Sequence, residues 1–201
     1  EPIRRRVIRR QQRRRLGQPV ALEHEDPDRT HIHVLTAGVD RNFNGMFEPD
    51  SGDVAPQWFV INSAGDVVAD SLTFEGFFNS FPIRVAVDEK RSNGILYVAQ
   101  LGRIRAFDLR TRILLRDTVA PGNYSGVSFE PLSGALLCHM RTGFASRGYV
   151  VAIDPQSGDT LGIYQAGINP QMSVAQYDGS TQGPAVYTLN EGTFTKPDAS
   201  I

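Results

Sequence analysis

The segment with the clearest capacity for chemistry is an oxygen-rich loop at residues 40–53, which reads Asp-Arg-Asn-Phe-Asn-Gly-Met-Phe-Glu-Pro-Asp-Ser-Gly-Asp. Oxygen side chains stand at its first, third, fifth and ninth positions, and the glycine at its sixth position permits a tight turn. Ca²⁺ prefers roughly six to eight hard oxygen ligands, and the spacing matches the start of an EF-hand loop. The loop therefore predicts a structural calcium site whose ligands come from Asp40, Asn42, Asn44, Met46 (through its carbonyl), Glu48, Asp50 and Asp53.

The loop departs from an EF-hand at its twelfth position, where Ser51 stands in place of a bidentate glutamate. Asp50 or Asp53 could supply the missing carboxylate, which leaves the coordination number open. The flanking sequence has no helical pattern, so a complete EF-hand is not expected. The alternative is an Asn/Gly turn that satisfies its own backbone without a metal.

A second group of polar and aromatic residues falls in the connections between predicted strands. Asn79, Asn123 and Asn169 recur at similar intervals, each in a Gly- or Pro-containing connection. Such a mixture suits the binding of a small ligand or a partner protein. The alternative is that the asparagines only shape their turns. The predicted binding face consists of Phe77, Phe78, Asn79, Asn123, Tyr124, Arg141, Arg147 and Asn169.

The first fifteen residues are dominated by arginine, although the whole chain has a net charge of only −1. Like charges at this density repel one another, so we expect residues 1–29 to be a flexible leader that ends in an acidic linker. The arm could bind nucleic acid, acidic lipid or an acidic protein surface. The alternative is that the leader is a solvated tail. The basic residues of the arginine-rich arm are Arg4, Arg5, Arg6, Arg9, Arg10, Arg13, Arg14 and Arg15.

Motifs for catalysis do not stand out in the sequence. It contains no G-x-S-x-G elbow, P-loop, H-E-x-x-H or C-x-x-C motif. The single cysteine, Cys138, lies in an apolar run and is predicted to be a buried strand residue. His31 and His33 are expected to be exposed histidines of a strand rather than metal ligands. These observations favour a protein that is not an enzyme.

From residue 31 onward, the elements that must position these groups are predicted to be strands. Short runs rich in Val, Ile, Phe and Tyr are bounded by Gly, Pro, Asn, Asp or Ser, and no helix is expected there. No apolar run approaches the ~20 residues that a membrane-spanning helix needs. The predicted strands lie at 32–35, 58–61, 67–74, 83–87, 95–99, 104–107, 113–119, 126–129, 135–139, 149–153, 160–164, 172–175 and 185–189.

The turns that end some of these runs recur at a constant interval. Asn62, Asp108 and Asp154 each close an apolar run, and they lie 46 residues apart. Self-similarity at about 40–50 residues, with several short strands in each unit, is typical of β-propeller blades. The chain is therefore predicted to be all-β. The expected blade units are about 30–81, 82–124, 125–170 and 171–201, the first lacking a recognisable first strand and the last holding at most three strands.

About four blades, of which the first and the last are incomplete, predict a part of a larger propeller, or a propeller completed by another chain. The alternatives are a small closed ring and an open antiparallel sandwich.

The segment Val-Tyr-Thr-Leu-Asn-Glu-Gly-Thr-Phe at 186–194, with the turns Phe-Asp-Leu-Arg-Thr and Ile-Asp-Pro-Gln-Ser-Gly, resembles YVTN-type, surface-layer-like β-propellers of secreted bacterial proteins. The loop at 40–53 is similar to calcium loops inserted in integrin-type blades. This resemblance implies a periplasmic, cell-surface or secreted protein. In that family a Leu-Asn-Glu-Gly-Asn-Phe segment often opens the propeller. Here its counterpart either begins a further set of blades or closes the ring.

These expectations combine into an exported, non-enzymatic binding module. A structural Ca²⁺ loop stiffens it, and one loop face meets a partner protein or a small ligand. The first alternative is a propeller-type hydrolase or lactonase with a metal held by inner-strand carboxylates. The second is a scaffold that the arginine-rich arm tethers to a polyanion.

Overall fold

The computed structural model describes residues 24–25, 31–42, 47–65, 67–76, 85–91, 93–100, 102–143, 145–176 and 185–192. Over these residues the protein is built from β-strands and one turn of 3₁₀ helix, η1 (Pro49–Ser51), so the all-β prediction is confirmed. None of the described helices is long and apolar enough to cross a membrane. The strands are β1 (His24–Glu25), β2 (His31–Thr36), β3 (Gln57–Asn62), β4 (Val67–Thr73), β5 (Val85–Asp88), β6 (Ile95–Gln100), β7 (Arg103–Asp108), β8 (Leu114–Pro121), β9 (Tyr124–Phe129), β10 (Leu136–Met140), β11 (Arg147–Ile153), β12 (Thr160–Ile168), β13 (Pro170–Gln176) and β14 (Ala185–Asn190).

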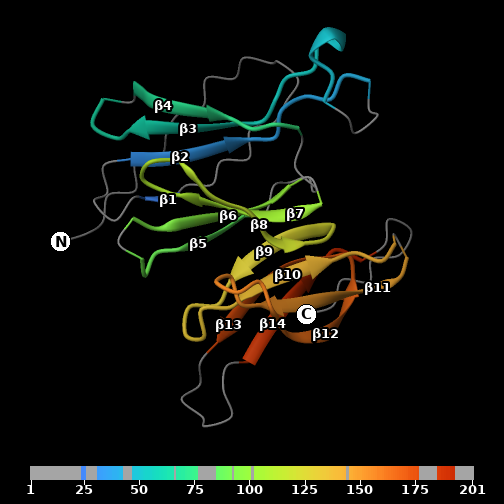
Figure 1. The fold of residues 1–201 in the computed structure, drawn as a ribbon. Helices are drawn as coiled ribbons and strands as arrows, with labels where there is room; N and C mark the ends of the chain where they lie inside the picture. The colour runs from blue at the N-terminus through green and yellow to red at the C-terminus, as the bar shows by residue number, and fades with distance from the viewer. Residues whose placement is uncertain are drawn as a thin grey trace, which may run out of the picture.

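The strands form four antiparallel sheets whose order follows the chain. Three sheets have four strands each, in the orders β1-β2-β3-β4, β5-β6-β7-β8 and β9-β10-β11-β12. The fourth sheet consists of β13 and β14. Figure 1 shows the sheets succeeding one another through the molecule, from β1–β4 at one end to β13–β14 at the other. Each four-stranded sheet is an antiparallel meander, because strands that follow one another in the chain are neighbours in the sheet.

The middle sheets are apolar on both faces, so each packs against a sheet on either side. In β5–β8, Val98 and Phe107 face the preceding sheet, where they meet the fully buried Trp58. Tyr97 and Ile104 point the opposite way into the core shared with β9–β12. This follows from the two-residue period of a strand, which sends successive side chains to opposite faces.

The sheet β9–β12 repeats this division. Leu136 and Cys138 of β10 lie in the core shared with β5–β8 and are 0% exposed. Burial raises the pKa of the Cys138 thiol to about 12, which fits the predicted buried strand residue. Leu137, Val150 and Ala152 form a separate cluster on the other face, toward β13–β14. The sheets therefore stack face to face in chain order.

The three regularly spaced turn residues occupy the same position in successive sheets, between the third strand and the fourth. Asn62 Oδ1 accepts a hydrogen bond from the Ala64 N–H at 2.8 Å. Asp108 Oδ1 accepts from the Thr111 N–H at 2.6 Å, and Asp154 Oδ1 accepts from the Gln156 N–H at 2.8 Å. Each side chain accepts a hydrogen bond from a turn N–H group that lies outside the strand pairing.

The first sheet has a first strand that the sequence did not predict. β1 pairs with β2 through His24 opposite His33 and Glu25 opposite Ile32, within the segment expected to be a linker. Two residues carry too little alternation to be recognised as a strand from sequence. Farther along, β12 and β13 are longer than predicted and only Asn169 separates them.

Candidate loop face and calcium loop

The loop face is the end of the sheets where the connections from second to third strands and from one sheet to the next lie. Neighbouring connections on this face are bonded to one another. The Gly122 N–H donates to the Gly102 carbonyl at 2.6 Å, which joins the β8–β9 connection to the β6–β7 connection. Gln100 Nε2 donates to the carbonyls of Glu75 and Gly76 at 3.0 and 2.8 Å, so the connection after β4 is tied to the end of β6.

An arginine pair lies where β7 leaves the loop face. Arg103 and Arg105 both reach Asp117 Oδ1, at 3.3 and 2.9 Å. Arg105 is 8% exposed, donates to Gln100 Oε1 at 3.2 Å and lies over the Phe107 ring at 5.7 Å. A buried guanidinium needs such partners, because an unpaired charge in the interior is costly. Arg105 is therefore held in position at this end of the sheet by Asp117, Gln100 and the Phe107 ring.

A second polar group lies at the β10–β11 and β12–β13 connections. Glu191 Oε2 accepts from Gln171 Nε2 at 2.8 Å and lies 3.8 Å from Arg141 Nη2. Asn169 Nδ2 donates to the Gly192 carbonyl at 2.8 Å. The residues that follow β14 are thus held to the two preceding connections.

The structure brings some of the predicted face residues to this surface. Arg141 and Arg147 stand at the two ends of the β10–β11 connection, Arg147 exposed and Arg141 half-buried. Asn123 is exposed beside Gly102. Phe77, Phe78 and Asn79 lie outside the described residues.

Two predicted face residues lie in the interior instead. Tyr124 is 5% exposed and belongs to the core between β5–β8 and β9–β12, where its hydroxyl donates to the Pro121 carbonyl at 3.2 Å. Burial raises the pKa of the Tyr124 hydroxyl. Asn169 is 2% exposed and has a left-handed backbone with φ of 54°. Its side chain shapes the connection, which agrees with the turn alternative.

The predicted calcium loop joins β2 to β3 and so belongs to the loop face. Its base is closed by two hydrogen bonds between Val39 and Val54, at 2.8 and 2.9 Å. Inside the loop, the Asp53 carboxylate accepts from the N–H groups of Arg41 and Glu48 at 2.8 and 2.9 Å. These bonds lower the pKa of Asp53, because they favour the charged carboxylate. Asp53 therefore holds two parts of the loop together, because each of its carboxylate oxygens accepts a hydrogen bond from a backbone N–H.

Other predicted metal ligands are only partly brought together. Asn42 Nδ2 donates to Glu48 Oε2 at 2.7 Å, so these two side chains meet. Asp50 is exposed within η1, and Ser51 Oγ donates to the Glu48 carbonyl at 2.7 Å. Asn44 and Met46 lie outside the described residues, and among those described no three His, Cys, Asp or Glu side chains form a group that could hold a metal. The eight arginines of the arm also lie outside the described residues.

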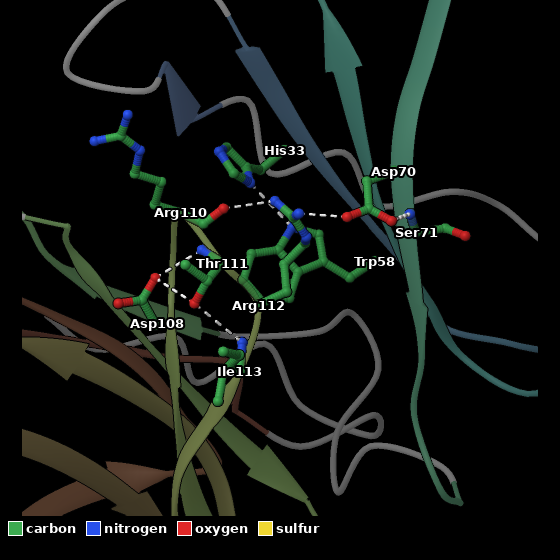
Figure 2. A network of polar contacts seen from close by, with 9 residues as sticks. All are labelled: His33, Trp58, Asp70, Ser71, Asp108, Arg110, Thr111, Arg112 and Ile113. Atoms are coloured by element: carbon green, nitrogen blue, oxygen red, sulfur yellow. Dashed lines mark hydrogen bonds and ion pairs between the residues drawn. The ribbon is translucent and has the colours of Figure 1, made fainter.

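A network that the sequence did not reveal lies at the opposite end, between the first two sheets. Figure 2 shows Arg112, from the β7–β8 turn, reaching Asp70 of the outer strand β4 and the carbonyl of Arg110. One sheet farther on, Arg116 of β8 donates to the carbonyls of Pro155 and Gln156 in the β11–β12 turn, at 3.2 and 2.7 Å. At the first two of the interfaces between sheets, an outer strand thus binds the turn of the next sheet.

The same view corrects the expectation for His33. This side chain is 3% exposed, and its Nδ1 accepts a hydrogen bond from Trp58 Nε1 at 3.1 Å. The expectation of an exposed histidine was therefore wrong, since Trp58 on the neighbouring strand covers it (Figure 2). His31, two residues earlier on the same strand, is half-buried.

Comparisons with known proteins show no family for this chain. No protein-family model matches it, and no curated protein matches it. Among solved structures, it is similar to hydrazine synthase of Kuenenia stuttgartiensis, with 17% sequence identity and a TM-score of 0.48. That match covers 82% of this chain and 42% of the other, so the chain spans less than half of the chain it matches.

Proposed function

We propose that the chain is a β-propeller segment that serves as a non-enzymatic binding module and presents its loop face to a partner protein or a small polar ligand. In this proposal each four-stranded sheet is one blade. The consecutive meanders support it, because each keeps its strands in chain order and packs on the next one face to face. The first strands also support it, since β9 lies beside both β5 and β13. First strands that adjoin one another line the axis of a propeller.

The observation that carries the binding role is the bonding of the loop face across sheets. Connections from different sheets are held by hydrogen bonds that involve Gly102, Gln100 and Glu191. A rigid scaffold beneath the loops lowers the entropy lost when a ligand binds. Binding residues are therefore expected on these connections rather than on the sheet faces.

The charges on the loop face indicate what kind of ligand it suits. Arg141 lies 3.8 Å from Glu191, and Arg103 lies 3.3 Å from Asp117, while Arg147 is exposed at the end of the β10–β11 connection. Arginines next to carboxylates suit a partner that carries both signs of charge, as a protein surface does. Following the resemblance of its turns, we place the module outside the bacterial cytoplasm.

Calcium in the 40–53 loop is the second part of the proposal. Asp40, Asn42 and Glu48 would hold the ion, with Asn44 and the Met46 carbonyl as further ligands. The contact between Asn42 and Glu48 supports this set, while Asp53 bonds the backbone. Ca²⁺ would add rigidity to a loop that already has an internal brace, so we assign it a structural role.

The test compares a loop-face charge reversal with a matched reversal at the opposite end. Arg147→Glu changes one exposed arginine of the loop face, and Arg110→Glu changes one exposed arginine of the turn between β7 and β8. Envelope proteins and small molecules retained by the immobilised wild-type chain are identified by mass spectrometry and then titrated individually. We expect a ligand whose affinity falls at least about tenfold with the loop-face variant and stays unchanged with Arg110→Glu. Ligands that respond to Arg110→Glu alone would contradict the proposal.

A further inference from the structure

A buried histidine and the single tryptophan of the chain form a hydrogen-bonded pair inside the first sheet. Trp58 is 0% exposed and His33 is 3% exposed, so both rings are shielded from water. The Trp58 Nε1–H donates to His33 Nδ1 at 3.1 Å, and the two ring centroids lie 5.6 Å apart. Figure 2 shows the two side chains, which come from the neighbouring strands β2 and β3. Such a buried pair is stable only while each partner keeps its role as donor or acceptor.

The chemistry of this bond fixes where the proton of His33 lies. An indole N–H can only donate a hydrogen bond, so the ring nitrogen that accepts it must carry a lone pair. Nδ1 of His33 is therefore unprotonated, and the proton of the neutral imidazole is on Nε2. A second proton can enter this ring only at Nδ1, where it would face the Trp58 N–H. A positive charge on His33 and the bond to Trp58 thus exclude one another.

Trp58 connects this pair to the junction of the first two sheets. Its ring packs edge-on against Phe107 of β7, with 6.3 Å between the centroids and an interplanar angle of 86°. Both rings belong to the core between β1–β4 and β5–β8. An indole N–H left without an acceptor in this interior costs free energy, and so does a buried imidazolium charge. The junction is therefore weaker when His33 is charged.

Ionisable groups of both signs stand on the elements around His33. Arg112 is bonded to Asp70, and Asp108 accepts hydrogen bonds in its own turn. These charges influence the pH at which His33 titrates. They do not change what the titration breaks, because a nitrogen that accepts the indole N–H cannot hold a proton at the same time. The groups are His24 and Glu25 of β1, with His24 opposite His33 in register, His31 of β2, Asp70 of β4, Arg105 and Asp108 of β7, and Arg110 and Arg112 of the β7–β8 turn.

We propose that His33 and Trp58 form an acid-sensitive switch at the junction of the first two sheets. At neutral pH the unprotonated Nδ1 holds the indole N–H and fixes Trp58 against Phe107. Acidification through the range in which imidazoles titrate adds a proton at Nδ1 and breaks that bond. The stabilisation is therefore present above this range and is lost as the pH falls through it. The switch involves neither the loop face nor calcium, so it stands or falls independently of the proposed function.

The first test follows both rings in the wild-type chain by nuclear magnetic resonance. Long-range ¹⁵N–¹H spectra should show the Nε2–H tautomer of His33 at neutral pH. As the pH falls from about 7.5 to about 5, the indole proton of Trp58 should shift upfield in step with the charging of His33, because it loses its hydrogen bond. A charged His33 at neutral pH, or an indole signal that stays constant over this range, would overturn the proposal.

Two variants separate this pair from the other histidines. His33→Asn keeps an acceptor, since the amide oxygen can take the place of Nδ1, but it cannot become charged. His31→Asn is the matched control, because it removes a half-buried histidine two residues earlier on β2. Between about pH 7.5 and about pH 5, the melting temperatures of the wild type and of His31→Asn should fall by about 2–10 °C more than that of His33→Asn.

Equal falls in all three proteins, or a larger fall in His33→Asn, would contradict the switch. Circular dichroism checks that both variants fold. If His33→Asn does not fold, the titration of the Trp58 indole proton in the wild type decides the question alone.

Discussion

Two adjacent leucines of β10 allow the stacking of the sheets to be measured. Leu136 faces the core between two four-stranded sheets and is 0% exposed. Leu137 faces the two-stranded sheet, is 6% exposed and lines an open apolar groove beside β14. The same change, leucine to alanine, removes the same atoms from the same strand in two different environments. We expect Leu136→Ala to lower the free energy of unfolding more than Leu137→Ala.

The magnitude follows from the cavity that each change leaves. Losing the buried atoms of a leucine costs about 2 kcal/mol before any cavity forms, and each Å³ of residual cavity adds about 24 cal/mol. At Leu136 a closed cavity of about 50–100 Å³ would add about 1–2.5 kcal/mol, for a total of about 3–4.5 kcal/mol. At Leu137 the vacated space joins the open groove, so the loss in free energy of unfolding stays at about 2 kcal/mol.

Urea unfolding at 25 °C, followed by tryptophan fluorescence and circular dichroism together, gives the two values. Both variants should keep the slope of the wild-type transition, so that the shift in midpoint reports stability alone. A Leu137→Ala cost equal to or larger than that of Leu136→Ala would refute the reasoning, because it would mean that both faces of β10 are closed to the same degree.

Three further predictions concern the 40–53 loop and a close backbone approach at Gly148 of β11. The pKa of Asp53 lies below its ordinary value, so Asp53→Asn should lower the melting temperature above about pH 4, and the difference from wild type should shrink as the pH falls through the folded pKa; a difference that grows with acidity would contradict the brace. Removing calcium with a chelator should lower the melting temperature of the wild type and leave that of Asp40→Ala unchanged, since the variant would lack a ligand; an equal drop in both would count against the site. Gly148→Ala should destabilise the protein strongly, because a Cβ there would lie 2.4 Å from the Met140 carbonyl oxygen and 2.5 Å from Pro170 Cδ. In the control Gly134→Ala, the added Cβ meets no atom within 4 Å and is unfavourable only because of the φ of 75°. Thermal unfolding of both variants checks this, and equal falls in melting temperature would contradict the close approach.

The strands were predictable because their pattern depends on local chemistry. Alternation of apolar residues, with Asn or Asp closing three of the runs, indicated where strands end, and Asn62, Asp108 and Asp154 do bond turn N–H groups. The burial of Cys138 also followed from its apolar neighbours.

Contacts between sheets were not predictable in the same way. Trp58 covers His33, and Arg112 reaches Asp70 across 42 positions of sequence, because the sheets stack face to face. Tyr124 looked like a loop residue next to Asn123, yet it opens β9 and its ring enters the core. The oxygen spacing of the 40–53 loop did not reveal that Asp53 would accept hydrogen bonds from the backbone. Any carboxylate in a turn can accept hydrogen bonds from N–H groups and need not bind a metal.

The central claim is that the sheets are arranged radially, with their first strands adjoining one another. Nuclear Overhauser effects in an isotope-labelled sample test it most directly. We expect contacts between β5 and β9 and between β9 and β13, including the Ser173 amide with the Ser128 side chain, whose oxygen lies 3.0 Å from the amide nitrogen. Contacts that instead place the outer strand β8 or β12 against β9, with none between the first strands, would contradict the account.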